Sequence, residues 1–370
     1  MKSNARLWAL AVLLSANASA APFVAIGDNA ELFLTASTSV SIDDNIYLRS
    51  AGEVDDTILN FAPGLDLVFG RNAATSGNVF YRHEFLKYMD VSQQDTNLAH
   101  AGINTLYQNG KSKLDFGVGY DEFATNEPSA PGAIVERTVT AVRAVGEVGV
   151  TEKTSVGGGV RFENTDYALG GSYKDSDIVT IPLDVYFEYS PKLQASLGYR
   201  YRSTDLAAGG IGSKDHFLNV GARGEFTPKL VGQVRLGYVT RKFDNSRDDS
   251  SFGADANLNF AATAKTSLTL GFTSDYGSSA TGDSTQTTSF NAGLNNRIDD
   301  QWSWNANLAY RAIDYPTRSD DFFQGGVGIA YTYNSFVNFA GSITHRSQSS
   351  PLASAEFDNN VFSLAANIRY

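Results

Sequence analysis

Residues 193–202 read Leu-Gln-Ala-Ser-Leu-Gly-Tyr-Arg-Tyr-Arg, with an apolar or aromatic side chain at every second position. Successive side chains of a β-strand point to opposite faces, so this stretch predicts a strand with one apolar and one polar face. The polar face carries Arg200 and Arg202. A dry protein core does not accept such groups without partners, which favours a wet environment on that side.

The same alternation recurs along the whole chain, in about 18 segments separated by polar breaks. Short breaks and longer breaks alternate along the chain. The short breaks lie near residues 70–75, 109–110, 151–153, 191–192, 228–229, 264–265, 299–300 and 334–335. The longer breaks lie near residues 43–56, 89–95, 124–133, 164–176, 204–213, 243–250, 275–285, 314–321 and 347–356.

Tight turns at one rim and longer loops at the other are typical of a transmembrane antiparallel up-and-down β-barrel. We therefore predict an all-β fold with about 18 strands, 16 being the alternative. A soluble sandwich or propeller also has alternating strands, but it could not bury so many polar inner faces. No loop exceeds roughly 15 residues, so we expect none to fold inward and narrow the pore.

The first residues have the pattern of a secretory signal peptide. Lys2 and Arg6 precede an apolar run, Leu7–Leu14, and Ala18-Ser19-Ala20 supplies the small residues of a cleavage site. The run is too short to cross a membrane as a helix, and no later stretch approaches about 20 apolar residues. We predict a signal peptide over residues 1–20 and a single barrel domain over residues 21–370.

The end of the chain alternates up to its final residue. Phe362, Leu364, Ala366, Ile368 and Tyr370 share one face. This arrangement resembles the terminal strand signal that the barrel-assembly machinery recognises, so that machinery is an expected partner, together with outer-membrane lipids.

Composition excludes several classes of function. The chain of 370 residues has no cysteine, so it has no disulfide scaffold, cysteine-ligated metal or thiol nucleophile. A net charge of −11 argues against a nucleic-acid-binding module. The four histidines lie in different segments without metal-ligand spacing, and there is no G-x-S-x-G motif. We expect no enzyme, and no catalytic, cofactor-binding or metal-binding residue.

The polar face is the expected functional surface, because it would line a water-filled lumen. The residues predicted to line it are Arg82, Arg143, Arg161, Arg200, Arg202, Arg223, Arg235, Arg241, Arg311, Asp115, Asp184 and Glu188. Guanidinium and carboxylate groups on neighbouring strands would form ladders, such as Arg161 with Glu147, or Arg223 with Glu225. Arginines in water could also hold the oxygens of a hydroxyl-rich or anionic solute for a short time.

Three segments near the beginning of the mature chain resemble a known family. Asp43-Asp44-Asn45-Ile46-Tyr47 follows the first strand, Phe61–Leu65 contains a Pro-Gly pair, and Tyr81–Tyr88 forms a tyrosine-containing third strand. This order resembles the putative β-barrel porin type 2 family. Members of this family are expected to be barrels of about 18 strands. Their genes often lie beside those of exopolysaccharide or capsule assembly systems. The resemblance implies a conduit that works with a periplasmic polysaccharide export protein.

The expected function is therefore an outer-membrane pore, in the bacterial cell outer membrane, for secretion of exopolysaccharide. A general or sugar-selective diffusion porin is the first alternative, and a structural or adhesive barrel is the second. In every case the solute would be hydrophilic, and a passive pore must bind it weakly enough to release it.

Overall fold

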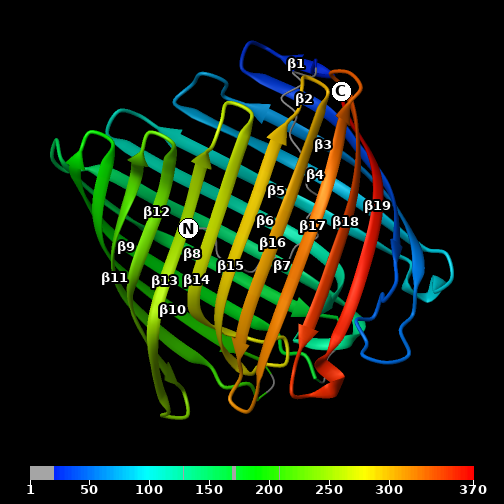
Figure 1. Ribbon diagram of the computed structural model, residues 1–370. Helices are drawn as coiled ribbons and strands as arrows, with labels where there is room; N and C mark the ends of the chain where they lie inside the picture. Colours follow the sequence, from blue (N-terminus) through cyan, green and yellow to red (C-terminus); the bar gives the residue numbers. More distant parts are fainter. Residues whose placement is uncertain (1–20, 128, 169–171, 208) are drawn as a thin grey trace.

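The computed structural model describes residues 21–370 except residues 128, 169–171 and 208, so the predicted signal peptide lies outside the described residues. The strands form one antiparallel sheet in which each strand pairs with the strand before it in the sequence. The last strand, β19, pairs with β2 and closes the sheet (Figure 1). Of the 19 strands, β1 pairs only with β2, so 18 strands form a closed wall. The predicted barrel and its strand number are confirmed.

The first nine wall strands and β1 have the following bounds: β1 (Val24–Ile26), β2 (Ala30–Asp43), β3 (Asp56–Phe69), β4 (Thr75–Tyr88), β5 (Thr96–Gln108), β6 (Ser112–Glu127), β7 (Ala130–Gly149), β8 (Thr154–Tyr167), β9 (Ser176–Ser190) and β10 (Leu193–Leu206). The others are β11 (Ser213–Thr227), β12 (Leu230–Phe243), β13 (Asp248–Ala261), β14 (Thr266–Ser278), β15 (Ser284–Arg297), β16 (Trp302–Asp314), β17 (Ser319–Thr332), β18 (Val337–Ser349) and β19 (Phe357–Arg369).

The two rims differ as the sequence predicted. Turns such as residues 191–192 and 228–229 form the short-turn rim, which lies at the top of Figure 1. Loops such as residues 44–55 and 350–356 form the opposite, long-loop rim. Two 3-10 turns, η1 (Ser92–Gln94) and η2 (Ala353–Ala355), belong to the long-loop rim. Among the described residues, no helix has the length and apolar character needed to span a membrane.

Large apolar side chains cover the outside of the wall. Leu197 is 56% exposed and Val220 is 62% exposed, although both lie in the middle of a strand. Tyr189 and Trp302 are exposed next to the short turns, where aromatic girdles meet lipid head groups. A band of exposed leucine, valine and aromatic side chains around a closed sheet fits contact with lipid.

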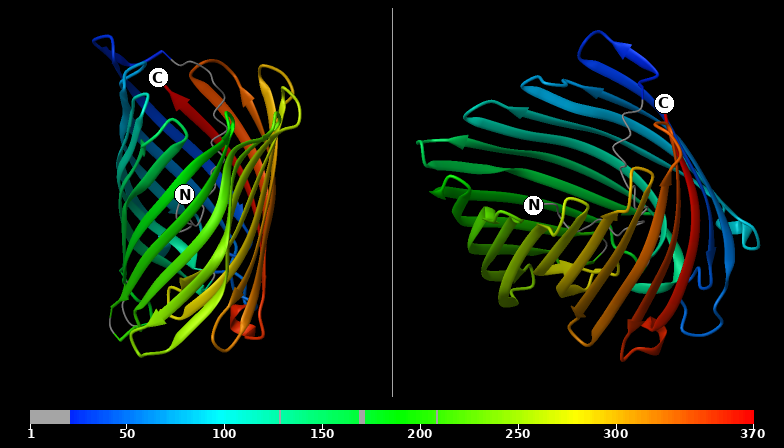
Figure 2. Two further views of the ribbon diagram at one scale, coloured as in Figure 1. Left: turned by 90° about the vertical axis from the view of Figure 1, so that its left-hand side faces the viewer. Right: turned by 45° about the horizontal axis from the view of Figure 1, so that its top comes forward.

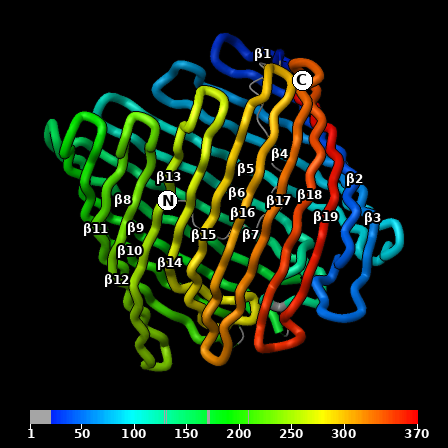
Figure 3. Tube along the Cα trace, in the orientation of Figure 1, coloured from blue at the N-terminus to red at the C-terminus, as the bar shows by residue number. Residues whose placement is uncertain are grey.

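The barrel is flattened, so that two walls face each other across its inside. It is narrower when turned by 90°, and the strands of its two walls cross at an angle (Figure 2). The trace shows β5–β7 behind β14–β17 (Figure 3). Side chains from strands that are not neighbours can therefore meet inside the barrel.

One hairpin leaves the wall at the long-loop rim. Pairing between β13 and β14 stops at Ala254 and Ser274, and pairing between β15 and β16 begins at Gln286 and Asp314. The segment between them, residues 275–285, is paired only within its own hairpin. We call this segment the hairpin tip.

The hairpin tip bridges to the opposite wall. The backbone N–H of Lys174 donates to the Ala280 carbonyl at 2.9 Å, and the backbone N–H of Ala280 donates to the Ser129 hydroxyl at 3.3 Å. Ala280 is buried as a result. The expectation that no loop folds inward is therefore wrong. That expectation was based on loop length. The hairpin tip reaches inward because the ends of β14 and β15 extend beyond their pairing with β13 and β16.

The first long loop, residues 44–55, also folds inward. The Asn126 side chain donates to the Ile46 carbonyl at 2.7 Å, and Tyr47 accepts a backbone hydrogen bond from Gly132 at 2.8 Å. Leu48 is buried in an apolar cluster with Phe322 and Phe357, which come from β17 and β19. Packed loops thus narrow the long-loop end of the barrel.

Candidate functional site: the inner face of the barrel

Ion pairs between distant strands identify the inner face. Arg223 on β11 contacts Glu147 on β7 at 2.6 Å, and Arg200 on β10 contacts Asp275 on β14 at 2.8 Å. Three strands separate the partners in each case, so the side chains can meet only on the concave side of the wall. Their strands carry exposed leucine and valine at the alternate positions, as a wet lumen inside an apolar band requires.

Two of the predicted arginines hold the hairpin tip in place. Arg241 donates to the Gly277 carbonyl at 2.7 Å, and Arg202 donates to the Tyr276 carbonyl at 2.6 Å. Both guanidinium groups also bind Asp215, which is fully buried between them. A carboxylate that accepts charge-assisted hydrogen bonds from two arginines fixes their geometry, and it thereby fixes the hairpin tip.

A second group of charges lies half-way along the strands. Arg143 contacts Asp115 at 2.8 Å, and Arg235 contacts Asp184 at 3.2 Å and the Tyr186 hydroxyl at 3.1 Å. These four residues were predicted to line the lumen, and the structure brings them together in two pairs.

Three other predicted residues have no carboxylate partner within 4.0 Å in the described part of the chain. They are Arg82 on β4, Arg161 on β8 and Arg311 on β16. Arg311 lies over the Phe322 ring, 4.1 Å from its centroid, near the long-loop rim. Arg161 lies directly opposite Arg143 in the β7–β8 register.

The neighbouring part of the inner face is rich in amide side chains. Asn104 on β5 donates to the Asn78 amide oxygen at 3.3 Å, and Asn78 donates to Asp66 at 3.1 Å. This row of two amides and one carboxylate crosses three adjacent strands and can offer hydrogen bonds to a hydroxylated solute. Within the described residues there is no group of three or more histidine and acidic side chains suited to a metal ion.

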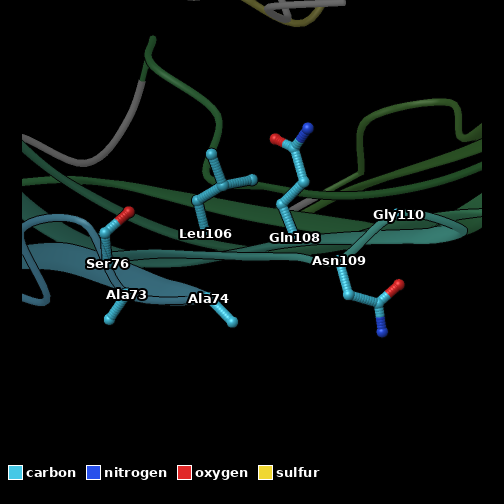
Figure 4. A pocket seen from close by; sticks show the side chains of 7 residues that line it. All are labelled: Ala73, Ala74, Ser76, Leu106, Gln108, Asn109 and Gly110. Carbon is cyan, nitrogen blue, oxygen red and sulfur yellow. The ribbon is translucent and has the colours of Figure 1, made fainter.

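The short-turn end of the lumen contains two open cavities. One, of about 440 Å³, lies between the β3–β4 and β5–β6 turns, where Ser76, Leu106 and Gln108 stand on one side of the sheet and Asn109 on the other (Figure 4). The other, of about 610 Å³, is lined by charged side chains that include Glu188, Glu147 and Arg223. Glu188 therefore lies at the mouth and not in the mid-depth group.

The predicted ladder partners are wrong. Arg223 was expected to pair with Glu225, but Glu225 contacts Lys192 at 2.6 Å, and Arg223 reaches across to Glu147. Arg161, expected to pair with Glu147, makes no ion pair among the described residues. The expectation treated the wall as flat, whereas curvature brings β7 closer to β11 than strand order suggests.

Sequence reasoning did not single out Asp215, which is a fully buried carboxylate. It stands at an alternate position to Leu218 and Val220, which are exposed to the outside. The alternation along β11 was therefore a signal that could have found it. The hairpin tip had no comparable signal, because its position depends on where neighbouring strands stop pairing.

A family comparison identifies the barrel. The family described as putative beta-barrel porin 2 matches residues 21–370. The chain belongs to this porin family. The porin lies in the bacterial outer membrane, as its family and its barrel with an apolar outer band require. It is a channel, which agrees with the resemblance seen in the first strands.

Solved porins share the fold of this porin at low sequence identity. OccAB2 from Acinetobacter baumannii matches with a TM-score of 0.50 and 10% identity, covering 93% of this chain and 98% of the other. OccK2 (OpdF) from Pseudomonas aeruginosa, solved in complex with glucuronate, matches with a TM-score of 0.50 and 10% identity, covering 92% and 98%. No curated protein matches the porin in sequence. At this identity the likeness concerns the fold alone.

Proposed function

We propose that this porin is a diffusion channel for small hydrophilic solutes, the alternative stated above, and not a conduit for exopolysaccharide. The hairpin tip is the observation that carries the proposal. It crosses to the opposite wall, where Ala280 bonds to Lys174 and Ser129, and a polymer chain would have to push it aside. A small solute needs only the space that the tip leaves open.

Two further observations support small solutes. Buried arginines fix the tip through Asp215, so its displacement would break charge-assisted hydrogen bonds in a site shielded from water. OccK2, which shares the fold, was solved with glucuronate, a single sugar acid. On this proposal the porin needs no periplasmic export protein, and the solute crosses by passive diffusion.

The absence of cysteine allows a direct experiment. In the variant Ser129→Cys with Ala280→Cys, oxidation should lock the hairpin tip to the opposite wall, because the two positions already touch. Locked porin in liposomes should admit glucose at the wild-type rate in a swelling assay. The single variants, oxidised in parallel, control for the reagent.

The results separate the three functions considered. Continued glucose flux through the locked barrel supports a small-solute porin. Loss of all flux on oxidation, with recovery on reduction, would mean that the tip has to open and would favour the polymer conduit. No flux through any form would favour the structural or adhesive barrel.

A further inference from the structure

One part of the inner wall has no charged residue at mid-depth. It consists of residues 267–273, 287–295 and 303–309, which lie side by side on β14, β15 and β16. We call these three segments the neutral patch. The inner-facing charged groups nearest to it in the same wall are Arg297 at its short-turn end and Asp255, Asp275 and Arg311 on its long-loop side.

Four polar side chains surround a glycine at the centre of the neutral patch. The register partners of Gly293 are Thr269 on β14 and Asn307 on β16, and Asn291 and Asn295 lie two positions away on β15. All five residues face inwards, because they alternate with the exposed aromatic and leucine side chains of the outer face. Thr269, Asn291 and Asn295 are exposed, so water in the lumen reaches them.

The space above Gly293 is open. Apart from its two chain neighbours, no described residue has an atom within 4 Å of the place that a Cβ atom would take at Gly293. A Cβ atom at Gly326 would lie 3.1 Å from the Asn307 amide oxygen, and one at Gly271 would lie 3.8 Å from the Asn291 amide nitrogen. These two amides therefore lie against the wall over neighbouring glycines, and they leave the centre of the patch free.

The polar groups around Gly293 have hydrogen-bonding capacity to offer. In the described part of the chain, none of the four side chains hydrogen-bonds to another protein group. The wall behind the patch, formed by β5–β7, is different (Figure 3). There Arg143 binds Asp115 at 2.8 Å, and His100 contacts Asp121 at 2.9 Å. The charged wall is thus occupied by its own ion pairs, whereas the neutral patch is available to a solute.

We propose that the neutral patch binds one ring of an uncharged sugar above Gly293, at a site that rests on the proposed diffusion function. Each hydroxyl group of a sugar both donates and accepts hydrogen bonds, and the asparagine amides and the threonine hydroxyl offer both as well. Because glycine has no side chain, the C–H face of the ring can approach the backbone closely. Such neutral contacts are weak, which lets the solute leave again.

Glucose is the probe, and tetraethylene glycol, which has a similar size but only two hydroxyl groups, is the control solute. In planar bilayers, glucose should lower the ion current through wild-type porin in a saturable manner, and tetraethylene glycol should not. Gly293→Val fills the open space without a clash and should abolish the saturable effect. Asn291→Ala should raise the half-saturating glucose concentration about fivefold, the value of one neutral hydrogen bond.

Gly119 provides a matched control variant in the opposite wall. It faces inwards on β6, and a Cβ atom there would meet only an Asp121 oxygen, at 3.8 Å. Gly119→Val adds the same volume to the lumen as Gly293→Val, but away from the neutral patch. The half-saturating glucose concentration should therefore stay at the wild-type value.

The results separate the binding site from the porin function. The same half-saturating glucose concentration in wild type, Gly293→Val and Asn291→Ala would overturn the site. Glucuronate differs from glucose by its carboxylate, and a stronger effect of glucuronate that Gly293→Val removes would overturn the uncharged ligand class. Glucose flux in liposomes without a saturable effect on the current would contradict the site alone, whereas absence of conductance in every form would contradict both proposals.

Discussion

At the scale of single residues, Asp215 links the two arginines that hold the hairpin tip. It accepts hydrogen bonds from Arg202 and Arg241 and is shielded from water. Asp215→Asn removes the charge, so that Arg241 loses its carboxylate partner and Arg202 keeps only Asp275. We expect the free energy of unfolding to fall by about 3–5 kcal/mol, as for other buried pairs that lose one partner. Urea unfolding in lipid vesicles measures it.

A surface pair in the same barrel supplies the matched control. Asp249 accepts a hydrogen bond from Arg247 at 2.8 Å, but side chains of both residues are largely exposed. Asp249→Asn should therefore cost less than about 1 kcal/mol. Equal losses in the two variants would show that burial of Asp215 does not matter.

At the scale of elements, the hairpin tip sets the width of the long-loop end. Replacement of residues 279–283 by Asn-Gly removes the contacts to Ser129 and Lys174 and joins the paired positions Ser278 and Ser284 by a two-residue turn. We expect a higher single-channel conductance and entry of larger oligosaccharides in the swelling assay. Deletion of residues 245–246, in an exposed loop of the same rim, should change neither property.

Some elements could be predicted from the sequence because their causes are local. Asn109-Gly110 and Pro191-Lys192 mark turns through their own backbone preferences, and the alternation around them fixes which side chains share a face. The partners of Arg161 and Arg223 could not be predicted in this way. They depend on how far the closed wall bends, and the inward tip depends on where β13 and β16 end.

At the scale of the whole molecule, the barrel is apolar outside and wet inside. Val220→Arg places a charge at the middle of the outer face and should cost about 2–4 kcal/mol. Asn291 lies at the middle of β15, at an alternate position to the outward Phe290, and is exposed. Asn291→Arg should cost little, because its charge stays in water. Unfolding free energies in vesicles measure both, and the reverse order would contradict the assignment of faces.

The joint between β19 and β2 has a consequence for biogenesis. Ser41 donates to Ser363 at 2.9 Å across this joint, although more than three hundred residues separate them in the chain. The first strand must therefore keep a free edge during the whole of translation and export, until the last strand arrives. Such edges attract other chains, and distant pairing is slow. The first hairpins are therefore open to wrong pairing until the ring is sealed.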